Sequence, residues 1–356
     1  MKDLFIKPTI NDLAREAGVS LATVDRVMNN RPGVRDATIM RVRHAVEKLG
    51  YVRNTAAASL ARSRFLHFLF ILPDHRDDAF CLELTRRLHD YEATMIWQCL
   101  HLTILKAPNF EPQTIKKWVT DIVPDRIDGV ALFAPETPPV RDAIDHIRAR
   151  GIATVALVSD QPSSTRDYFI GIDNVAAGRT AARLITRFHP HRQGRLLVIT
   201  GARLERNHLE RRFGFDCVVR ETSSGFTVLP TVEMKRMGKD PQEIHKALAH
   251  IFRRDRDISG IYVSGGLGPD LAACLRHLKQ THAHHRKMMI VAHELTPLSR
   301  QALEDGTLDA VISQNQEDLI RNTIDVLRTK VDETSAHLAD NHLRIDIFLK
   351  DNMPLP

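Results

Sequence analysis

Residues 9–29 read TINDLAREAGVSLATVDRVMN, and their pattern predicts the local structure of the N-terminal part of the chain. Thr9, with an acidic residue three positions later, is typical of a helix N-cap, and apolar residues then recur at helical spacing. Gly18 stands where a helix C-cap is expected, and Ser20 is a good N-cap for a second helix over residues 21–29. The stretch therefore predicts two short helices joined by a tight glycine turn.

A third helix is predicted from Asp36 to Gly50, because apolar residues again recur at helical spacing before a glycine. Its expected core positions are Ile39, Val42, Val46 and Leu49. The second helix should bury Val24, Val27 and Met28 and turn the opposite face outward, where Leu21, Ala22, Asp25, Arg26 and Asn29 can reach base edges. Any small helical bundle has such a pattern, so spacing alone leaves two interpretations open: a DNA-binding head or a simple bundle.

The charge distribution favours the DNA-binding interpretation. Residues 1–64 carry twelve Lys and Arg against six Asp and Glu, and the other residues carry 38 of each kind. The net charge of +6 therefore lies in the N-terminal segment, as expected where a basic head meets a polyanion. A basic head that serves only solubility is the alternative.

Four runs of this segment closely resemble the head of lactose-repressor-type (LacI/GalR) regulators: TINDLA at 9–14, AGVS at 17–20, TVDRVMN at 23–29 and LGY at 49–51. The resemblance implies a helix-turn-helix that places its second helix in the major groove of operator DNA. It implies DNA contacts from Thr9, Ser20, Leu21, Ala22, Thr23, Arg26, Asn29, Arg31, Asn54, Ala57 and Leu60.

Residues 53–64 form an alanine-rich segment that is too short to be a stable helix alone, so a plain linker is one interpretation. The resemblance implies instead a hinge helix that folds on DNA in a dimer, with Leu60 as the minor-groove wedge and Ala57 packed nearby. Two positions depart from the family pattern. Arg53 stands where proline is usual, and Asp25 stands where a small hydroxyl residue is usual. Asp25 can cap a helix, pair with Arg26 or accept a hydrogen bond from cytosine. The base sequence that the head recognises therefore stays open.

Beyond Phe65, buried-strand patterns alternate with helical patterns, as in parallel α/β sheets. The strands are expected at 68–72, 129–133, 154–158, 196–200, 260–263 and 289–292, and the helices at 78–91, 140–150, 176–188, 269–279 and 318–328. Two doubly wound lobes fit this length, with ligand groups beyond the carboxyl ends of the strands. The predicted domains are a head at 1–52, a hinge at 53–64 and an effector-binding and dimerisation domain at 65–356.

The runs IGIDN at 170–174, VAHEL at 291–295, LEDGTLDA at 303–310, SQN at 313–315 and IDIF at 345–348 resemble the two-lobed, doubly wound periplasmic-binding-protein-like (type I) fold with ribose-type sensors. The resemblance implies a sugar, polyol or related acid as effector, held by Phe80, Asp160, Asp173, Arg211, Glu294 and Gln314. Carboxylates, a guanidinium and an amide suit a polyhydroxylated molecule.

Each ligand position has a structural alternative: Phe80 as core, Asp160 as a turn residue, Asp173 as a helix cap and Arg211 on a solvated helix face. Glu294 and Gln314 are favoured as ligand groups over caps. Gly265 and Gly266 stand where many relatives carry Asn-Asp, so the effector cannot be copied from better-known members.

Other functional classes have little support. The four cysteines are scattered, no segment has the length of a signal peptide or membrane helix, and a cytoplasmic protein without a membrane partner is expected. The sequence GLGPD at 266–270 lacks the third glycine of a dinucleotide loop, and the histidines at 282–285 lack metal-ligand spacing. We expect no catalytic residue, no cofactor and no metal. The leading hypothesis is a homodimeric, ligand-controlled repressor; a solute-binding protein and a sugar-modifying enzyme are the alternatives.

Overall fold

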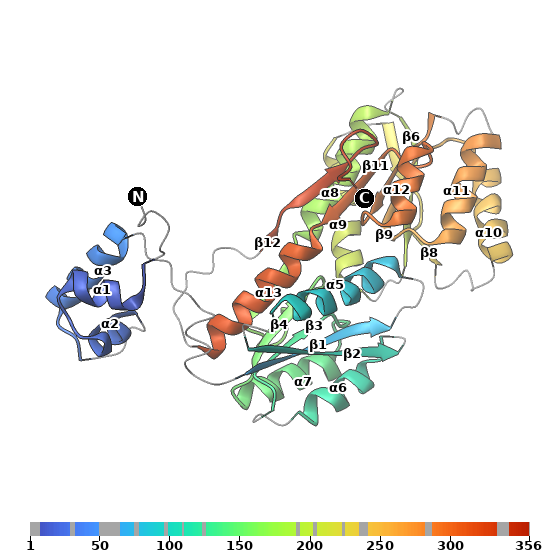
Figure 1. The fold of residues 1–356 in the computed structure, drawn as a ribbon. Helices are drawn as coiled ribbons and strands as arrows, with labels where there is room; N and C mark the ends of the chain where they lie inside the picture. Colours follow the sequence, from blue (N-terminus) through green and yellow to red (C-terminus); the bar gives the residue numbers. More distant parts are fainter. Residues whose placement is uncertain are drawn as a thin grey trace.

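The structure is a computed structural model and describes residues 8–28, 33–49, 65–74, 78–95, 99–108, 110–122, 126–189, 193–201, 205–222, 225–234, 241–281, 287–332 and 342–355. These residues form a three-helix head and a two-lobed α/β body, coloured along the chain in Figure 1. The expected hinge at 53–64 lies outside the described residues, as do five of the expected DNA contacts: Asn29, Arg31, Asn54, Ala57 and Leu60.

The head consists of α1 (Ile10–Ala17), α2 (Leu21–Met28) and α3 (Asp36–Leu49), as the sequence predicts. A capping box begins α1: the Thr9 hydroxyl accepts from the backbone N–H of Asp12, and the Asp12 carboxylate accepts from the backbone N–H of Thr9 at 2.8 Å. Gly18 ends the helix in the left-handed conformation with φ of 63°. The small core contains the expected apolar residues, with Leu13, Val24 and Val42 fully buried.

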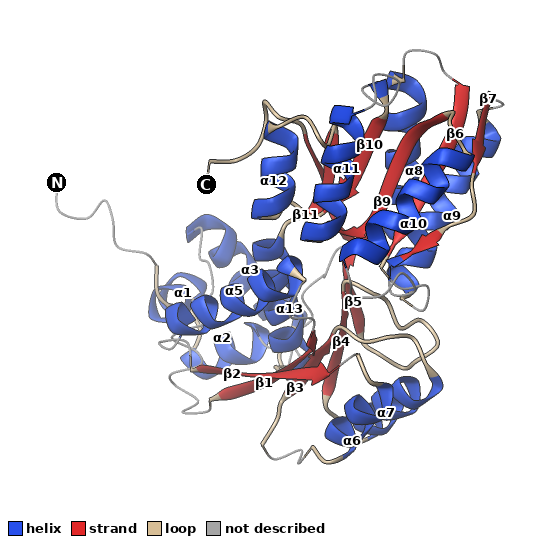
Figure 2. Ribbon diagram, turned by 90° about the vertical axis from the view of Figure 1, so that its right-hand side faces the viewer, coloured by secondary structure: helices blue, strands red, loops and turns tan. Residues whose placement is uncertain are grey.

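Lobe 1 is built on a parallel six-stranded sheet in the order β12-β5-β4-β3-β1-β2. Its strands are β1 (Leu66–Asp74), β2 (Leu100–Pro108), β3 (Gly129–Leu132), β4 (Ala153–Leu157), β5 (Tyr168–Ile172) and β12 (His342–Leu343). The helices α5 (Ala79–Met95), α6 (Pro112–Thr120) and α7 (Pro138–Ala149) connect these strands. Figure 2 shows helices on both faces of the sheet, which explains why the strands are continuously apolar.

Lobe 2 is built on a second sheet in the order β13-β11-β10-β9-β6-β7, and β8 also pairs with β6. Its strands are β6 (Gln193–Thr200), β7 (Gly225–Val228), β8 (Val232–Glu233), β9 (Ile258–Gly266), β10 (Met289–His293), β11 (Ala310–Gln314) and β13 (Ile345–Phe348). Only β13 among these described strands runs antiparallel to its neighbour. The helices are α8 (Asn174–Phe188), α9 (Arg206–Glu221), α10 (Pro241–Arg254), α11 (Pro269–Thr281) and α12 (Pro297–Glu304).

The chain crosses between the two lobes at three places within the described residues. It passes from β5 into α8, returns from β11 into α13 (Gln316–Val331), which packs against β4 and β5, and passes from β12 into β13. The C-terminal segment thus contributes to both lobes. Because β12 pairs with β5 and β13 pairs with β11, these crossings lie close together, an arrangement typical of a hinge between two lobes.

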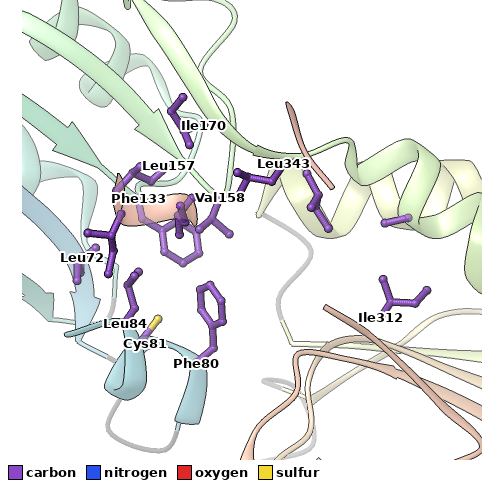
Figure 3. Close-up of a cluster of buried hydrophobic side chains, with 14 of the residues drawn as sticks. Leu72, Phe80, Cys81, Leu84, Phe133, Leu157, Val158, Ile170, Ile312 and Leu343 are labelled. Carbon is purple, nitrogen blue, oxygen red and sulfur yellow. The ribbon is translucent and has the colours of Figure 1, made fainter. Parts of the chain in front are cut away.

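One hydrophobic cluster contains side chains of both lobes (Figure 3). Phe80 extends from α5 toward Phe133 in lobe 1, and Ile312 enters the same cluster from lobe 2. Phe80 is 5% exposed. Phe80 is therefore a buried member of the hydrophobic core.

Candidate functional site

The predicted ligand residues gather where the carboxyl ends of the strands of both lobes face one another. Asp160 follows β4, Asp173 follows β5, Glu294 follows β10, and Gln314 ends β11. We call this region the inter-lobe site. The two lobes touch across it, because Arg206 Nη1 at the start of α9 lies 2.6 Å from Glu136 Oε2 of lobe 1. This is the end of a doubly wound sheet at which ligands bind.

Three of the predicted residues form one buried polar group. Gln314 Nε2 donates to Glu294 Oε1 at 3.0 Å, and Arg211 Nη2 lies 3.6 Å from the same oxygen. Arg211 also donates from Nε to Asn174 Oδ1 at 2.8 Å and from Nη1 to the Ser264 carbonyl at 2.9 Å. Its side chain is 2% exposed, so the alternative of a solvated helix face is wrong.

Glu294 is the chemically unusual member of this group. Burial raises the pKa of its carboxyl, although Arg211 and the hydrogen bond from Gln314 act in the opposite direction. Its φ of 66° lies in the left-handed region, which is uncommon for a residue other than glycine. Strained backbone that holds a buried ionisable group is typical of a binding site rather than of a simple core.

Two glycines bring Arg211 into the site by letting α8 and α9 cross closely. A Cβ atom at Gly178 would lie 1.8 Å from the Arg211 carbonyl oxygen, and one at Gly214 would lie 2.0 Å from the Val175 carbonyl oxygen. Both contacts are with backbone atoms, which cannot move aside cheaply. The close approach of the two helices therefore places Arg211 at the site, where Asn174 and Ser264 hold its guanidinium.

The other three predicted ligand residues have structural partners. Asp173 caps α8 by accepting from the Ala176 N–H at 2.9 Å. Asp160 accepts from the Gln161 N–H at 2.6 Å and from Arg166 Nη2 at 2.6 Å. With Phe80 in the hydrophobic cluster, each of these side chains occupies the structural role that was its alternative.

Near these strand ends lies a set of buried polar atoms, and sequence reasoning missed all of their residues except Gln314. Among the described residues, the side-chain atoms that are buried without a hydrogen-bond partner include Ser159 Oγ, Gln161 Oε1, Thr200 Oγ1, His293 Nδ1 and Gln314 Oε1. All five residues end or follow a strand at the inter-lobe site. Buried polar atoms are normally paired, so these atoms favour a polar ligand with several groups. A polar residue immediately after an apolar strand is the signal that could have identified them.

His293 is a second buried titratable residue of the inter-lobe site, beside Glu294. Its Nε2 lies 2.7 Å from the Tyr262 hydroxyl. Burial, together with the nearby Arg211 and His208, holds the pKa of the imidazole well below its ordinary value of 6.5. The ring is therefore neutral at neutral pH, and it can donate or accept a hydrogen bond without adding charge.

The head presents the predicted face of α2 to solvent. Ser20, Ala22 and Arg26 are exposed, and Leu21 is 47% exposed despite being apolar. Thr23 is half-buried, and its N–H donates to the Ser20 hydroxyl at 3.2 Å, which begins the helix. The face of α2 that the sequence predicts to contact DNA is therefore open to solvent over Leu21, Ala22 and Arg26.

The chain combines a helix-turn-helix head with a two-lobed body that has a buried polar site between its lobes. This combination is the class of protein that the fold and the site define. Residues 70–335 match the family described as the periplasmic binding protein domain, and residues 9–54 match the lacI family of bacterial regulatory proteins. The chain therefore belongs to the periplasmic binding protein domain family and carries a lacI-family helix-turn-helix head.

Curated proteins match parts of this chain. The chain is 28% identical over 180 residues to the HTH-type transcriptional regulator DegA of Bacillus subtilis, which covers 50% of this chain and 51% of that protein. It is 44% identical over 87 residues to catabolite control protein A of Priestia megaterium, which covers 24% of this chain and 26% of that protein. The chain thus spans about half or less of the length of these curated relatives.

Solved structures share the fold. A solute-binding protein from Burkholderia graminis in complex with D-arabinose has a TM-score of 0.68 and 19% identity, covering 81% of this chain and 96% of that one. The transcriptional regulator CelR in complex with cellobiose has a TM-score of 0.60 and 18% identity, covering 96% of this chain and 98% of that one. None of the described helices has the length and apolar character needed to span a membrane.

Proposed function

We propose that this protein is a sequence-specific DNA-binding transcriptional regulator, acting in the cytoplasm as a homodimeric repressor whose operator affinity is controlled by a small sugar-like or polyol ligand. The observation that carries the proposal is the match of residues 9–54 to the lacI family in a chain whose body is a periplasmic binding protein domain. Several matched relatives are named HTH-type transcriptional regulators, which supports regulation over catalysis.

The buried polar group supports the ligand class. Arg211 offers guanidinium donors, Glu294 offers a carboxyl, and Gln314 offers an amide oxygen without a partner. Donors and acceptors this close together suit a molecule with several hydroxyl groups. Proteins of the same fold bind D-arabinose and cellobiose, which makes sugars the first compounds to test.

The exposed face of α2 supports the DNA arm. Leu21, Ala22 and Arg26 lie on that face, and in the proposed dimer two copies would enter successive major grooves of a pseudo-palindrome. We propose phosphate contacts from Asn29 and Arg31 and a minor-groove wedge from Leu60 in the linker.

The experiment is a fluorescence-anisotropy titration of the full-length protein with duplexes that tile its own promoter region, compared with a random duplex at moderate salt. We expect a preferred duplex, binding that weakens steeply with salt, and a change in affinity when D-arabinose, D-glucose, cellobiose, xylitol or gluconate is present. Arg26→Ala should weaken specific binding, whereas Arg254→Ala on the body, 60% exposed, should not. Equal binding to every duplex would refute sequence-specific DNA binding. Sugar binding without any preference among duplexes would favour the alternative of a solute-binding protein.

A further inference from the structure

Two buried glutamines, one in each lobe, bridge neighbouring strand ends at the inter-lobe site. In lobe 1, Gln161 Nε2 donates to the carbonyl of Ala134, shortly after β3, at 2.8 Å. In lobe 2, Gln314 Nε2 donates to Glu294 Oε1 at 3.0 Å. Gln161 is 1% exposed and Gln314 is 3% exposed. Within the described part of the chain, the Oε1 atom of each is buried without a hydrogen-bond partner.

The partners of the two glutamines determine which end of each amide is left over. A backbone carbonyl and an ionised carboxylate only accept hydrogen bonds, so both NH2 groups must point at these partners. The amide oxygens that remain can accept a hydrogen bond and cannot donate one. The hydroxyls of Ser159 and Thr200, which are also buried without a partner among the described residues, can act in either direction. The buried groups of both lobes are therefore satisfied together by a ligand that donates hydrogen bonds.

Two arginines of lobe 2 at this site already face carboxylates. Arg211 Nη2 lies 3.6 Å from Glu294 Oε1. Arg206 Nη1 lies 2.6 Å from Glu136 Oε2, and its Nε lies 2.7 Å from Glu210 Oε1. A negatively charged ligand would have to compete with these carboxylates for the two guanidinium groups.

Carboxylates of the two lobes also lie close enough to repel one another. A Cβ atom at Gly266 of lobe 2 would lie 3.8 Å from Asp78 Oδ1 of lobe 1. Burial raises the pKa of Glu294, and Asp78 adds to that rise. Burial likewise raises the pKa of Glu210 in lobe 2, and Asp160 of lobe 1 adds to that rise. A further negative charge brought between these groups would be repelled in the same way.

We propose that the effector is an uncharged polyhydroxylated molecule, a polyol or a neutral sugar, and that the inter-lobe site rejects the analogue in which a carboxylate replaces one of its hydroxyl groups. The inference rests on the proposed function and narrows its ligand class. Hydroxyl groups of the ligand donate to the amide oxygens of Gln161 and Gln314. A carboxylate in place of a hydroxyl removes a donor, leaves a buried acceptor without a partner and brings like charges together.

The experiment is a calorimetric titration of the full-length protein with three matched pairs: sorbitol and gluconate, D-glucose and D-glucuronate, and D-galactose and D-galacturonate. In the best-bound pair, the neutral member should bind at least about tenfold more tightly than the acid. Glu294→Gln removes a buried carboxylate and leaves Arg211 without its counter-charge, so it should narrow this preference to less than about threefold. Glu304→Gln, at the exposed last residue of α12, is the matched control and should keep the preference within about twofold of the parent value.

Gln161→Met provides a second variant in the other lobe, and far-UV circular dichroism establishes that each variant is folded. It should also narrow the preference, because it removes an acceptor that only a donor can satisfy. An acid that the parent chain binds as tightly as its neutral partner, or a preference that folded variants of both positions leave unchanged, would overturn the inference while the proposed function stands. If the parent chain binds neither member of any pair, the ligand class of the proposed function fails, and the inference fails with it.

Discussion

Replacing Arg211 with methionine removes the cation that faces a buried carboxyl. Arg211 is 2% exposed, and its Nη2 lies 3.6 Å from Glu294 Oε1. Removing one partner of a buried pair costs about 3–5 kcal/mol, because the remaining charge is left without compensation. The separation is longer than that of a close ion pair, so we expect the free energy of unfolding to fall by about 3 kcal/mol at neutral pH.

The same substitution should make stability depend more strongly on pH. Burial already raises the pKa of Glu294 above its ordinary value of 4.5, and Arg211 opposes that rise, so the variant should have a still higher pKa. A group whose pKa is raised by folding stabilises the protein fully below its unfolded pKa, and this contribution is lost as pH rises through the folded pKa. The cost of Arg211→Met should therefore be smaller near pH 5 than at pH 7.5.

Urea unfolding followed by circular dichroism at the two pH values measures both effects. Arg212→Met is the control on the same helix. Arg212 Nε lies 2.8 Å from Asp216 Oδ2, and both side chains are about one-quarter exposed, so loss of this ion pair should cost less than about 1 kcal/mol. Adding Glu294→Gln to Arg211→Met should recover part of the loss at pH 7.5, since no buried charge remains. A cost below about 1 kcal/mol for Arg211→Met, or an equal cost at both pH values, would refute the reasoning.

Three further outcomes follow from the geometry. Gly178→Ala should destabilise the body by at least about 1–3 kcal/mol in urea unfolding, because its methyl group meets backbone atoms. Gly268→Ala is the control and should change the stability little, since a Cβ atom there has nothing within 4 Å, and equal effects would contradict the close helix crossing. Arg206→Gln breaks the ion pair with Glu136 across the inter-lobe site and should weaken sugar binding several-fold at low salt and less at high salt. An effect on sugar binding that does not depend on salt would show that the effect is not electrostatic. Thr9→Ala removes the cap of α1 and should cost about 1 kcal/mol and weaken operator binding, whereas unaltered thermal unfolding of the head would contradict that role for the cap.

Local chemistry explains why the head was predictable from sequence. The Thr9 capping box and the left-handed Gly18 are short-range devices, and the structure contains both where the pattern predicts them. The strands and helices of the body that were expected are likewise present, because continuous apolar runs and amphipathic periods are local signals.

The parts that could not be predicted depend on contacts between distant residues. Nothing near α13 or β12 in the sequence indicates that they return to lobe 1 after lobe 2 has been built. Likewise, whether Asp160 faces a ligand or a neighbouring side chain depends on Arg166, six residues later in the chain. The sequence pattern at a strand end does not show which later residue will pair with it. The burial of Arg211 required knowledge of the crossing at Gly178, which no single helix pattern contains.

Asn174 links the buried polar group to the place where the chain crosses between the lobes. It lies where the chain crosses from β5 into α8, where its Nδ2 donates to the Val158 carbonyl of lobe 1 at 3.2 Å and its Oδ1 accepts from Arg211 Nε of lobe 2 at 2.8 Å. Val158 and Glu294, at the two ends of this chain of contacts, both have left-handed backbone, with φ of 61° and 66°. A ligand that draws the guanidinium toward itself changes the bond to Asn174 and, through it, the carbonyl at the crossing. Lobe 1 begins at Leu66, shortly after the linker to the head. In the proposed regulator, we therefore expect occupancy to act on DNA binding through the angle between the lobes.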